Sequence, residues 1–418
     1  MSTTEHAAFS PLHVGPITLR NRFIKSGANE NMYRAGFPTQ ALLKHHRDLA
    51  AGGVALTTLA YAAVAKVGRT LPDQLWLREE VLPDLQAITE AVHQEGGKAA
   101  LQITHGGSFV TSIFVPHRTI SASSGINVAG LFHGNILQRA MNERDMAQVI
   151  QEFVDGAKLA QRAGFDAVEI HMGHGYLLNQ FISPLSNTRN DEYGGSAENR
   201  ARFPARVLSA VKQAVGQEMA VIAKINVADG VRGGATAEDA AITAQVLEKA
   251  GADMLVLSGG RNVESTWFMF GSPLNQEEFA KVFKHQPLQR LLMKVAALGT
   301  PKGLKFKERY FREYSLKVRE AVSIPLAYLG GVKSLANIEQ SLEEGFDAVA
   351  MARVLLHDPA LPNKFASGQL KQSGCTNCNG CVAQIYNRAG TYCILNEPND
   401  AALNEIRASE KIEARTQH

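Results

Sequence analysis

Cysteine and tryptophan are both scarce in this chain, which has four cysteines and two tryptophans among its 418 residues. The four cysteines all lie between positions 375 and 393, so thiols are missing from the rest of the sequence. A domain held together by scattered disulfides would distribute its cysteines differently. The pattern therefore favours a reducing, cytoplasmic setting in which the cysteines share one local site.

Long apolar runs and blocks of like charge are missing as well. No stretch of about eighteen consecutive apolar residues occurs, so we expect no membrane-spanning segment. The first ten residues, MSTTEHAAFS, have neither a basic region nor an apolar stretch and do not resemble a secretory signal. The net charge is only +3 and no long lysine or arginine block is present, which argues against nucleic-acid binding. A small-molecule substrate is the expected partner, and a homo-oligomer stays open.

Short apolar runs that alternate with helical patterns dominate the chain instead. Three fragments repeat, at 163–171, 250–258 and 344–352, and each joins a helix-ending glycine to a short buried strand. Eight alternations of strand and helix predict a (β/α)8 barrel, whose site lies at the carboxyl ends of its strands. The predicted strands are residues 23–28, 54–61, 99–103, 167–170, 221–225, 254–257, 326–329 and 348–351.

Two connections are longer than a barrel needs. Residues 105–143 follow the third strand and are expected to cap the barrel mouth, and residues 261–323 follow the sixth. We therefore predict one (β/α)8 barrel domain over residues 1–365. A cysteine-rich extension, residues 366–418, is predicted to pack on it.

The segment from His171 to Tyr176 carries the strongest chemical signal. It places His171, His174 and Tyr176 within six residues, directly after a buried strand. The histidine spacing is i, i+3 with no glutamate between, which rules out the zinc-protease pattern. Two imidazoles can hold a carbonyl oxygen or an anion, and a phenol can deliver a proton. These residues therefore predict a polar clamp for a small ligand.

The sequence from His171 to Phe203 resembles the signature of the Old Yellow Enzyme family of flavin-dependent ene-reductases, including the barrel domain of 2,4-dienoyl-CoA reductase. The resemblance extends from Phe9 to about Pro359. It implies FMN as the bound cofactor, NAD(P)H as cosubstrate and reduction of an activated carbon–carbon double bond. His171 and His174 would then polarise the withdrawing group of the alkene, while Tyr176 protonates its α-carbon.

The resemblance also implies cofactor contacts at the strand ends. Gln102 has an amide suited to the flavin pyrimidine, and Lys224 has a charge that offsets the anionic reduced flavin. A lysine inside an apolar run is costly without such a partner. Glycines after strands six and seven, with an arginine after strand eight, fit the phosphate site of a barrel. The expected set is Ser26, Gly27, Ala28, Asn29, Tyr61, Gln102, Lys224, Gly259, Gly260, Gly330, Gly331, Ala352 and Arg353.

The four cysteines predict a metal site at Cys375, Cys378, Cys381 and Cys393. Both zinc and a 4Fe–4S cluster accept four thiolates. The resembling family carries a 4Fe–4S cluster on a similar run, usually with three residues between the second and third cysteine, whereas this chain has two. The sequence after Cys393 is still similar to the family's, which favours iron–sulfur over zinc.

Two other classes of protein stay open at this stage. A barrel with a phosphate site can be a lyase or aldolase without redox chemistry, in which case Lys224 is a Schiff-base candidate. Alternatively, the cysteine cluster can serve an electron-transfer component that passes electrons to a partner flavoprotein. A yellow colour of the purified protein separates the first alternative from a flavoenzyme.

Overall fold

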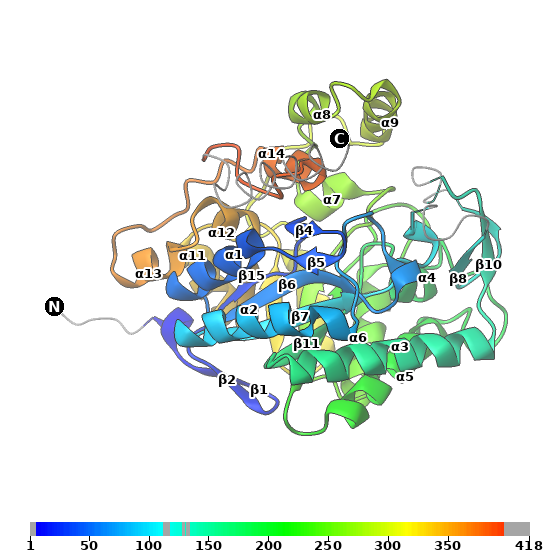
Figure 1. Cartoon of the computed structure of the whole chain (residues 1–418), viewed down its shortest axis with the longest axis horizontal. Helices are drawn as coiled ribbons and strands as arrows, with labels where there is room; N and C mark the ends of the chain where they lie inside the picture. The colour runs from blue at the N-terminus through cyan, green and yellow to red at the C-terminus, as the bar shows by residue number, and fades with distance from the viewer. Residues whose placement is uncertain (1–5, 112–117, 128–129, 131–133, 397–418) are drawn as a thin grey trace, which may run out of the picture.

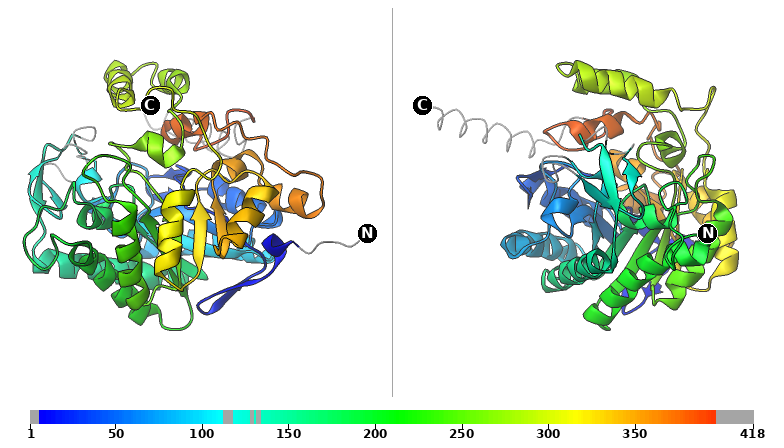
Figure 2. Two further views of the ribbon diagram at one scale, coloured as in Figure 1. Left: turned by 180° about the vertical axis from the view of Figure 1, so that it is seen from behind. Right: turned by 90° about the vertical axis from the view of Figure 1, so that its right-hand side faces the viewer.

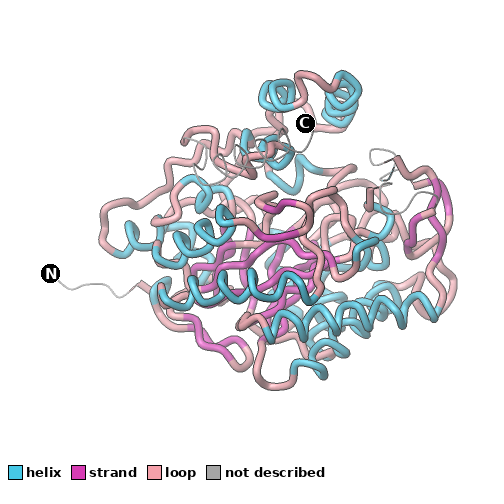
Figure 3. The backbone as a smooth tube through the Cα atoms, viewed as in Figure 1, coloured by secondary structure: helices cyan, strands magenta, loops and turns pink. Residues whose placement is uncertain are grey.

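The computed structural model describes residues 6–111, 118–127, 130 and 134–396 of the chain (Figure 1). Eight parallel strands at its centre form a closed barrel, and helices surround them (Figure 3). In barrel order the strands are β3 (Phe23–Lys25), β6 (Leu56–Ala63), β7 (Lys98–Thr104), β11 (Ala167–Met172), β12 (Ala220–Asn226), β13 (Met254–Ser258), β14 (Leu326–Leu329) and β15 (Ala348–Met351). The predicted (β/α)8 fold is confirmed, and each predicted run overlaps one barrel strand.

Alternation along each strand divides the barrel into an interior and an outer core. Interior positions near the amino ends of the strands are small or branched apolar residues, such as Ala100, Ala167 and Ile222, which pack together. The neighbouring positions, such as Leu101, Val168 and Val221, belong to the core shared with the surrounding helices. Those helices are α1 (Gln40–Ala51), α2 (Leu82–Gln94), α3 (Glu143–Arg162), α5 (Ala197–Val215), α6 (Ala237–Lys249), α10 (Arg312–Ala321), α11 (Leu335–Glu343), α12 (Arg353–His357) and α13 (Leu361–Ala366).

A hairpin of two short strands closes the amino end of the barrel. Strands β1 (Leu12–Val14) and β2 (Ile17–Leu19) pair antiparallel. Their apolar side chains join the interior cluster of the barrel, while the turn at Gly15 lies against Asp253, just before β13. The hairpin therefore fills the amino end of the barrel interior, and the polar residues of the interior lie toward the carboxyl end.

The two long connections lie at that opposite, carboxyl end. The first contains β8 (Thr119–Ser121), β9 (Gly125–Ile126) and β10 (Leu137–Ala140), which form a small sheet, and part of this connection is outside the described residues. The second contains α7 (Thr266–Phe270), α8 (Gln276–Val282) and α9 (Pro287–Ala297), of which α8 and α9 project above the barrel (Figures 1 and 2). Short elements β4 (Tyr33–Arg34), β5 (Phe37–Pro38) and α4 (Leu177–Ile182) complete the mouth.

The cysteine-rich segment runs over the same end of the barrel and includes α14 (Gly380–Ala383). Its Ser373 N–H donates to the carbonyl of Lys333 at 2.8 Å, and its Thr391 N–H donates to that of Glu30 at 2.7 Å. Ala383 packs with two phenylalanines of the second long connection, Phe279 and Phe283. The predicted extension beyond residue 396 lies outside the described residues, and the domain boundary after residue 365 stays a prediction. Within the described ranges, no helix combines the length and the hydropathy that crossing a membrane would take.

Candidate functional site

The predicted clamp lies where β11 leaves the barrel. Ala167, Glu169 and His171 occupy alternate positions of β11, so the imidazole of His171 faces the same side as the interior alanine. The chain then turns sharply through His174 and Gly175, which adopt left-handed conformations with φ of 61° and 85°. This turn brings Tyr176 back over the strand end.

The three side chains of the clamp contact one another. The ring centroid of His171 lies 4.9 Å from that of His174 and 4.8 Å from that of Tyr176. A second phenol joins them, because the hydroxyl of Tyr176 donates to that of Tyr61 at 3.1 Å. The structure therefore brings together all three residues predicted to be catalytic, with Tyr61 beside them.

Burial keeps both imidazoles neutral. Removal from water, followed by the electrostatic effects of His174 and Lys224, holds the pKa of His171 well below its ordinary value. Burial and then Lys224 lower the pKa of His174 to about 3. His171 Nδ1 accepts the N–H of Gly173 at 3.3 Å, so the proton of its neutral ring is on Nε2. His174 Nε2 lies 2.7 Å from Ser258 Oγ, which leaves Nδ1 for a ligand. Each ring can thus offer one nitrogen.

A hydrogen-bonded chain behind Tyr176 was not anticipated from the sequence. Gln74 Nε2 donates to the carbonyl of Tyr61, and Gln74 Oε1 accepts from the backbone N–H and the hydroxyl of Thr70. The hydroxyl of Thr70 is 2.6 Å from that of Tyr61. Since Thr70 gives its proton to Gln74, Tyr61 donates to Thr70 and accepts from Tyr176. Burial, followed by Tyr61, raises the pKa of Tyr176 well above its ordinary value, so the phenol stays protonated.

A polar layer lies inside the barrel, one step below the clamp. Lys224 is 1% exposed, and its ammonium donates to Ser26 Oγ at 2.8 Å and to the carbonyl of Gly27 at 2.6 Å. Gln102 Nε2 donates to Glu169 Oε1 at 2.5 Å. Ser26, Gln102 and Lys224 were predicted, whereas Glu169 was missed. The alternation of β11 could have found it, because it places Glu169 on the same side as His171.

This layer fits the flavin that the sequence resemblance implies. Both hydrogen-bond acceptors of Lys224 named above are neutral oxygens, so the ammonium retains charge for an anionic ligand. A Cβ at Gly27 would lie 2.5 Å from Gln102 Nε2, which shows how closely the backbone approaches the amide. A planar ring with an amide edge can meet both groups from the mouth of the barrel.

The other predicted cofactor residues are placed less uniformly. Cβ atoms at Gly259 and Gly330 would each lie 2.7 Å from the Phe311 ring, while those at Gly260 and Gly331 would meet neighbouring backbone. Asn29 Oδ1 accepts the N–H of Asn31, and the neighbouring Ala28 is exposed. Arg353, which follows Ala352 at the end of β15, donates to Asn379 Oδ1 at 2.5 Å and to the carbonyl of Phe270 at 3.0 Å. The arginine is therefore bound to the cysteine-rich segment.

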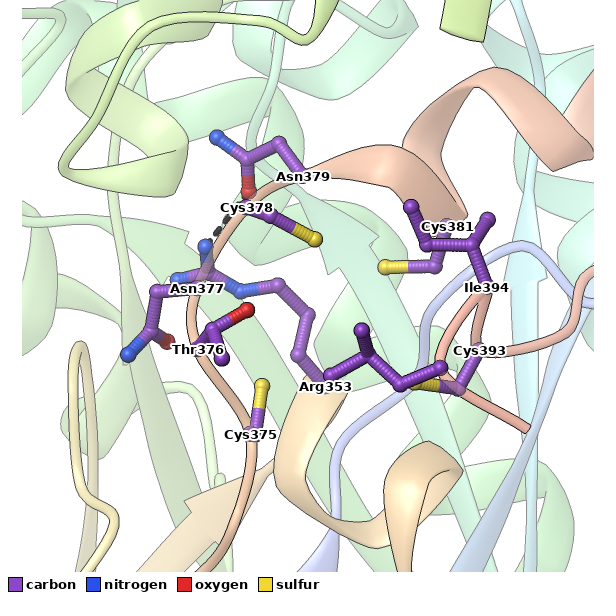
Figure 4. Close-up of a pocket in the computed structure, with 10 residues that line it drawn as sticks. Arg353, Cys375, Thr376, Asn377, Cys378, Asn379, Cys381, Cys393 and Ile394 are labelled. Atoms are coloured by element: carbon purple, nitrogen blue, oxygen red, sulfur yellow. Dashed lines mark hydrogen bonds between the residues drawn. The ribbon is translucent and has the colours of Figure 1, made fainter.

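The four cysteines line one small cavity together with Arg353 (Figure 4). All four are free thiols. The sulfur atoms of Cys378 and Cys381 point toward one another, and the Arg353 side chain lies among the group (Figure 4). Cys393 Sγ also lies 3.5 Å from Nδ1 of His357, a neighbour that the sequence did not indicate. The donor set, four thiols around one cavity, is the type that zinc and iron–sulfur clusters require.

Charge at this cavity depends on whether the thiols are ionised. Burial raises the pKa of Cys381 to about 12; Arg353 opposes this, and the other three cysteines add to it. The four sulfurs are therefore close enough to affect one another's ionisation. In the part of the chain that the structure describes, no three histidine, cysteine or acidic side chains converge closely enough to hold a single metal ion.

Comparison with known proteins agrees with this geometry. The model of the NADH:flavin oxidoreductase / NADH oxidase family matches residues 7–297. The chain is 38% identical over 392 residues to a 4,4'-dithiodibutanoate disulfide reductase of Rhodococcus erythropolis, which covers 93% of this chain and 95% of the relative. The chain is 29% identical to an NADH oxidase of Thermoanaerobacter brockii. The matched region covers 93% of this chain but only 55% of that protein.

Solved structures share the fold. An old yellow enzyme homologue from Zymomonas mobilis superimposes with a TM-score of 0.68 and 20% identity, covering 89% of this chain and 96% of that one. At that level of identity the likeness concerns the barrel and its connections.

Proposed function

Because the chain belongs to the NADH:flavin oxidoreductase / NADH oxidase family, we propose that it is an FMN-dependent enzyme that uses NAD(P)H to reduce an activated carbon–carbon double bond. The Old Yellow Enzyme resemblance of its sequence is confirmed, and the chain is an oxidoreductase. The grouping of His171, His174 and Tyr176 at the barrel mouth carries the finer proposal. A lyase or aldolase loses its basis, since the family is one of flavin oxidoreductases.

The clamp has the groups that such a reduction needs from the protein. His171 Nε2 and a nitrogen of His174 hold the carbonyl or other withdrawing group by hydrogen bonds, which makes the distant alkene carbon electrophilic. Tyr176 delivers a proton to the carbon next to that group. Bound FMN would supply the hydride. Ser26, Gly27, Gln102 and Lys224 would hold its ring, with Asn29 and Tyr61 at the mouth and the glycines after strands six and seven near its phosphate.

A second candidate substrate is an organic disulfide. The relative that is 38% identical and nearly equal in length is a disulfide reductase, which directs attention to this bond. Two-electron reduction of a disulfide gives one thiol and one thiolate. Tyr176 can protonate the departing thiolate as it protonates carbon, and the neutral imidazoles can hold a polar substituent. Both reactions can therefore use the same phenol.

We further propose that Cys375, Cys378, Cys381 and Cys393 bind an iron–sulfur cluster, with zinc as the alternative. Support comes from four free thiols that line one cavity. Arg353 in the same cavity would offset part of the negative charge of a tetrathiolate site.

The proposed function is tested first by its cofactor and then by its phenol. Acid-released cofactor should be FMN by chromatography. Tyr176→Phe should leave flavin reduction by NAD(P)H nearly intact while slowing oxidation of the reduced protein by an enone about 100- to 10,000-fold, the usual share of a general acid. Stopped-flow absorbance measures the two half-reactions separately.

The controls discriminate chemistry from structure. Tyr314→Phe changes a phenol away from the clamp and should alter neither half-reaction. Equal losses in both half-reactions of Tyr176→Phe, or FAD in place of FMN, would contradict the proposal. Mixing the prereduced protein with enones, enoyl thioesters and 4,4'-dithiodibutanoate then ranks the candidate substrates by rate.

A further inference from the structure

Glu169 is a buried carboxylate at the centre of the polar layer and has no part in the function proposed above. It is 1% exposed and lies on β11, opposite Gln102 of β7 and Ile222 of β12. Interior positions alternate along these strands, so Glu169, Gln102 and Lys224 all face the inside of the barrel, one step above the apolar layer that contains Ala100, Ala167 and Ile222. A carboxylate there is costly unless it is paired.

Its direct contact determines the orientation of a neighbouring amide. Gln102 Nε2 donates to Glu169 Oε1 at 2.5 Å. An ionised carboxylate only accepts hydrogen bonds, so Gln102 must turn its NH2 group toward Glu169. The carbonyl oxygen of the amide is then the atom that Gln102 presents on its other side. With Glu169 replaced by an amide, both orientations of Gln102 would become acceptable.

Its charge acts on Lys224. Burial lowers the pKa of Lys224, and the carboxylate of Glu169 is the leading influence that opposes this effect. Gly27 lies close to both groups: Lys224 donates to the Gly27 carbonyl, and a Cβ at Gly27 would lie 3.0 Å from Glu169 Oε1. Glu169 therefore helps to keep the ammonium protonated and also cancels part of its charge at the ligand.

We propose that Glu169 is a positioning residue of the flavin site. It holds the Gln102 amide with its oxygen toward the pyrimidine edge of the flavin, and it offsets Lys224 so that the anionic reduced flavin is not overstabilised. This inference rests on the proposed FMN site. A charge beside the ring shifts the affinity for reduced flavin relative to oxidised flavin, which appears as a change in midpoint potential.

The test combines FMN affinity and midpoint potential in matched variants. Glu169→Gln removes the negative charge and should raise the affinity for reduced relative to oxidised FMN about tenfold, which corresponds to about +30 mV for a two-electron couple. Lys224→Met should shift the potential in the opposite direction, and the double variant should lie between the two. Glu90→Gln, at an exposed position of α2, is the control and should match wild type.

A shorter carboxylate separates position from charge. Glu169→Asp keeps the negative charge but withdraws it from Gln102, so FMN, titrated into the deflavinated protein by its fluorescence, should bind about tenfold more weakly at a nearly unchanged potential. Unchanged affinity in Glu169→Asp overturns the positioning role, and an unchanged or lowered potential in Glu169→Gln overturns the charge role. If the far-ultraviolet circular dichroism of Glu169→Gln differs from that of wild type, this variant is not folded as wild type is. The FMN affinity of Glu169→Asp then decides whether Glu169 positions the flavin. Wild-type protein that binds no FMN overturns the proposed function itself.

Discussion

At the scale of single residues, the clamp works without a positive charge of its own. Burial lowers the pKa of both histidines, that of His174 to about 3, so near neutral pH they act as hydrogen-bond partners and not as cations. The positive charge at the site comes from Lys224, one layer below. An anionic ligand would therefore be positioned by the imidazoles and attracted from beneath.

The two neutral imidazoles and the charge of Lys224 together predict how phenols bind. His171→Ala or His174→Ala should each weaken the binding of a phenolate to the oxidised flavoprotein about tenfold, the cost of one hydrogen bond to a charged group. Long-wavelength charge-transfer absorbance measures the affinity. Exposed His285→Asn is the control. Affinities that stay at the wild-type value in both clamp variants would remove His171 and His174 from the ligand site.

The residue scale also shows where sequence reasoning stops. His171, His174 and Tyr176 could be predicted to converge because they follow one strand within six residues. Gln102 and Lys224 could be placed by the strands that carry them. Thr70 and Gln74 could not, since they lie in an irregular loop whose path depends on tertiary contacts. The orientation of Arg353 was equally hidden, because Asn379, 26 residues further on, determines it.

At the scale of elements, the cysteine-rich segment contacts two parts of the barrel mouth that are far apart in the sequence. Thr391 Oγ1 donates to the carbonyl of Asn29 at 2.9 Å, and Tyr386 packs against Phe283 with ring centroids 5.1 Å apart. The segment thus bridges the loop after β3 and the connection that contains α8. Any group bound by the cysteines would stabilise this bridge.

Metal analysis tests the segment directly. Anaerobically purified protein should contain about four irons with matching sulfide per chain, the composition of a 4Fe–4S cluster. Cys378→Ser should lower the iron content and make the cysteine-rich segment more accessible to limited proteolysis, because the bound group would hold the segment on the barrel. One zinc per chain would replace iron–sulfur by the alternative, and protein without metal would contradict both.

The elements were predictable to different degrees for a physical reason. Barrel strands are short apolar runs that alternate with helical patterns, and three of them follow helix-ending glycines, so their local composition identified all eight. The helices α7, α8 and α9 of the second long connection were not assigned, because they depend on packing at the mouth. Phe279 of α8, for example, is buried against Phe283 and the cysteine-rich segment.

At the scale of the whole molecule, buried neutral histidines predict sensitivity to acid. Burial lowers the pKa of His105 to about 4, and its Nδ1 accepts the N–H of Gly107 at 3.0 Å. The unfolded chain binds a proton on this residue near its ordinary value of about 6.5, before the folded protein does. Stability should therefore be complete above about pH 6.5 and fall as the pH drops toward 4.

One residue should account for a measurable share of that loss. His105→Asn keeps an acceptor for Gly107 but cannot be protonated, so between pH 7 and pH 4.5 it should lose about 2 kcal/mol less stability than wild type. Urea unfolding at the two pH values measures the difference. His13→Asn, at an exposed position of β1, should follow wild type. Equal losses in wild type and His105→Asn would contradict the assignment.

The hairpin of β1 and β2 has a consequence for how ligands enter and leave the barrel. Because its apolar side chains fill the amino end of the barrel, the polar layer of the described chain faces the carboxyl end, from which ligands would approach it. If the nicotinamide and the second substrate of the proposed reaction occupy the same space above that layer, the nicotinamide would have to leave before the second substrate binds. Alternating turnover, in which the cosubstrate and the second substrate compete for the site at high concentration, would then follow from the eight residues 12–19 at the opposite end of the barrel.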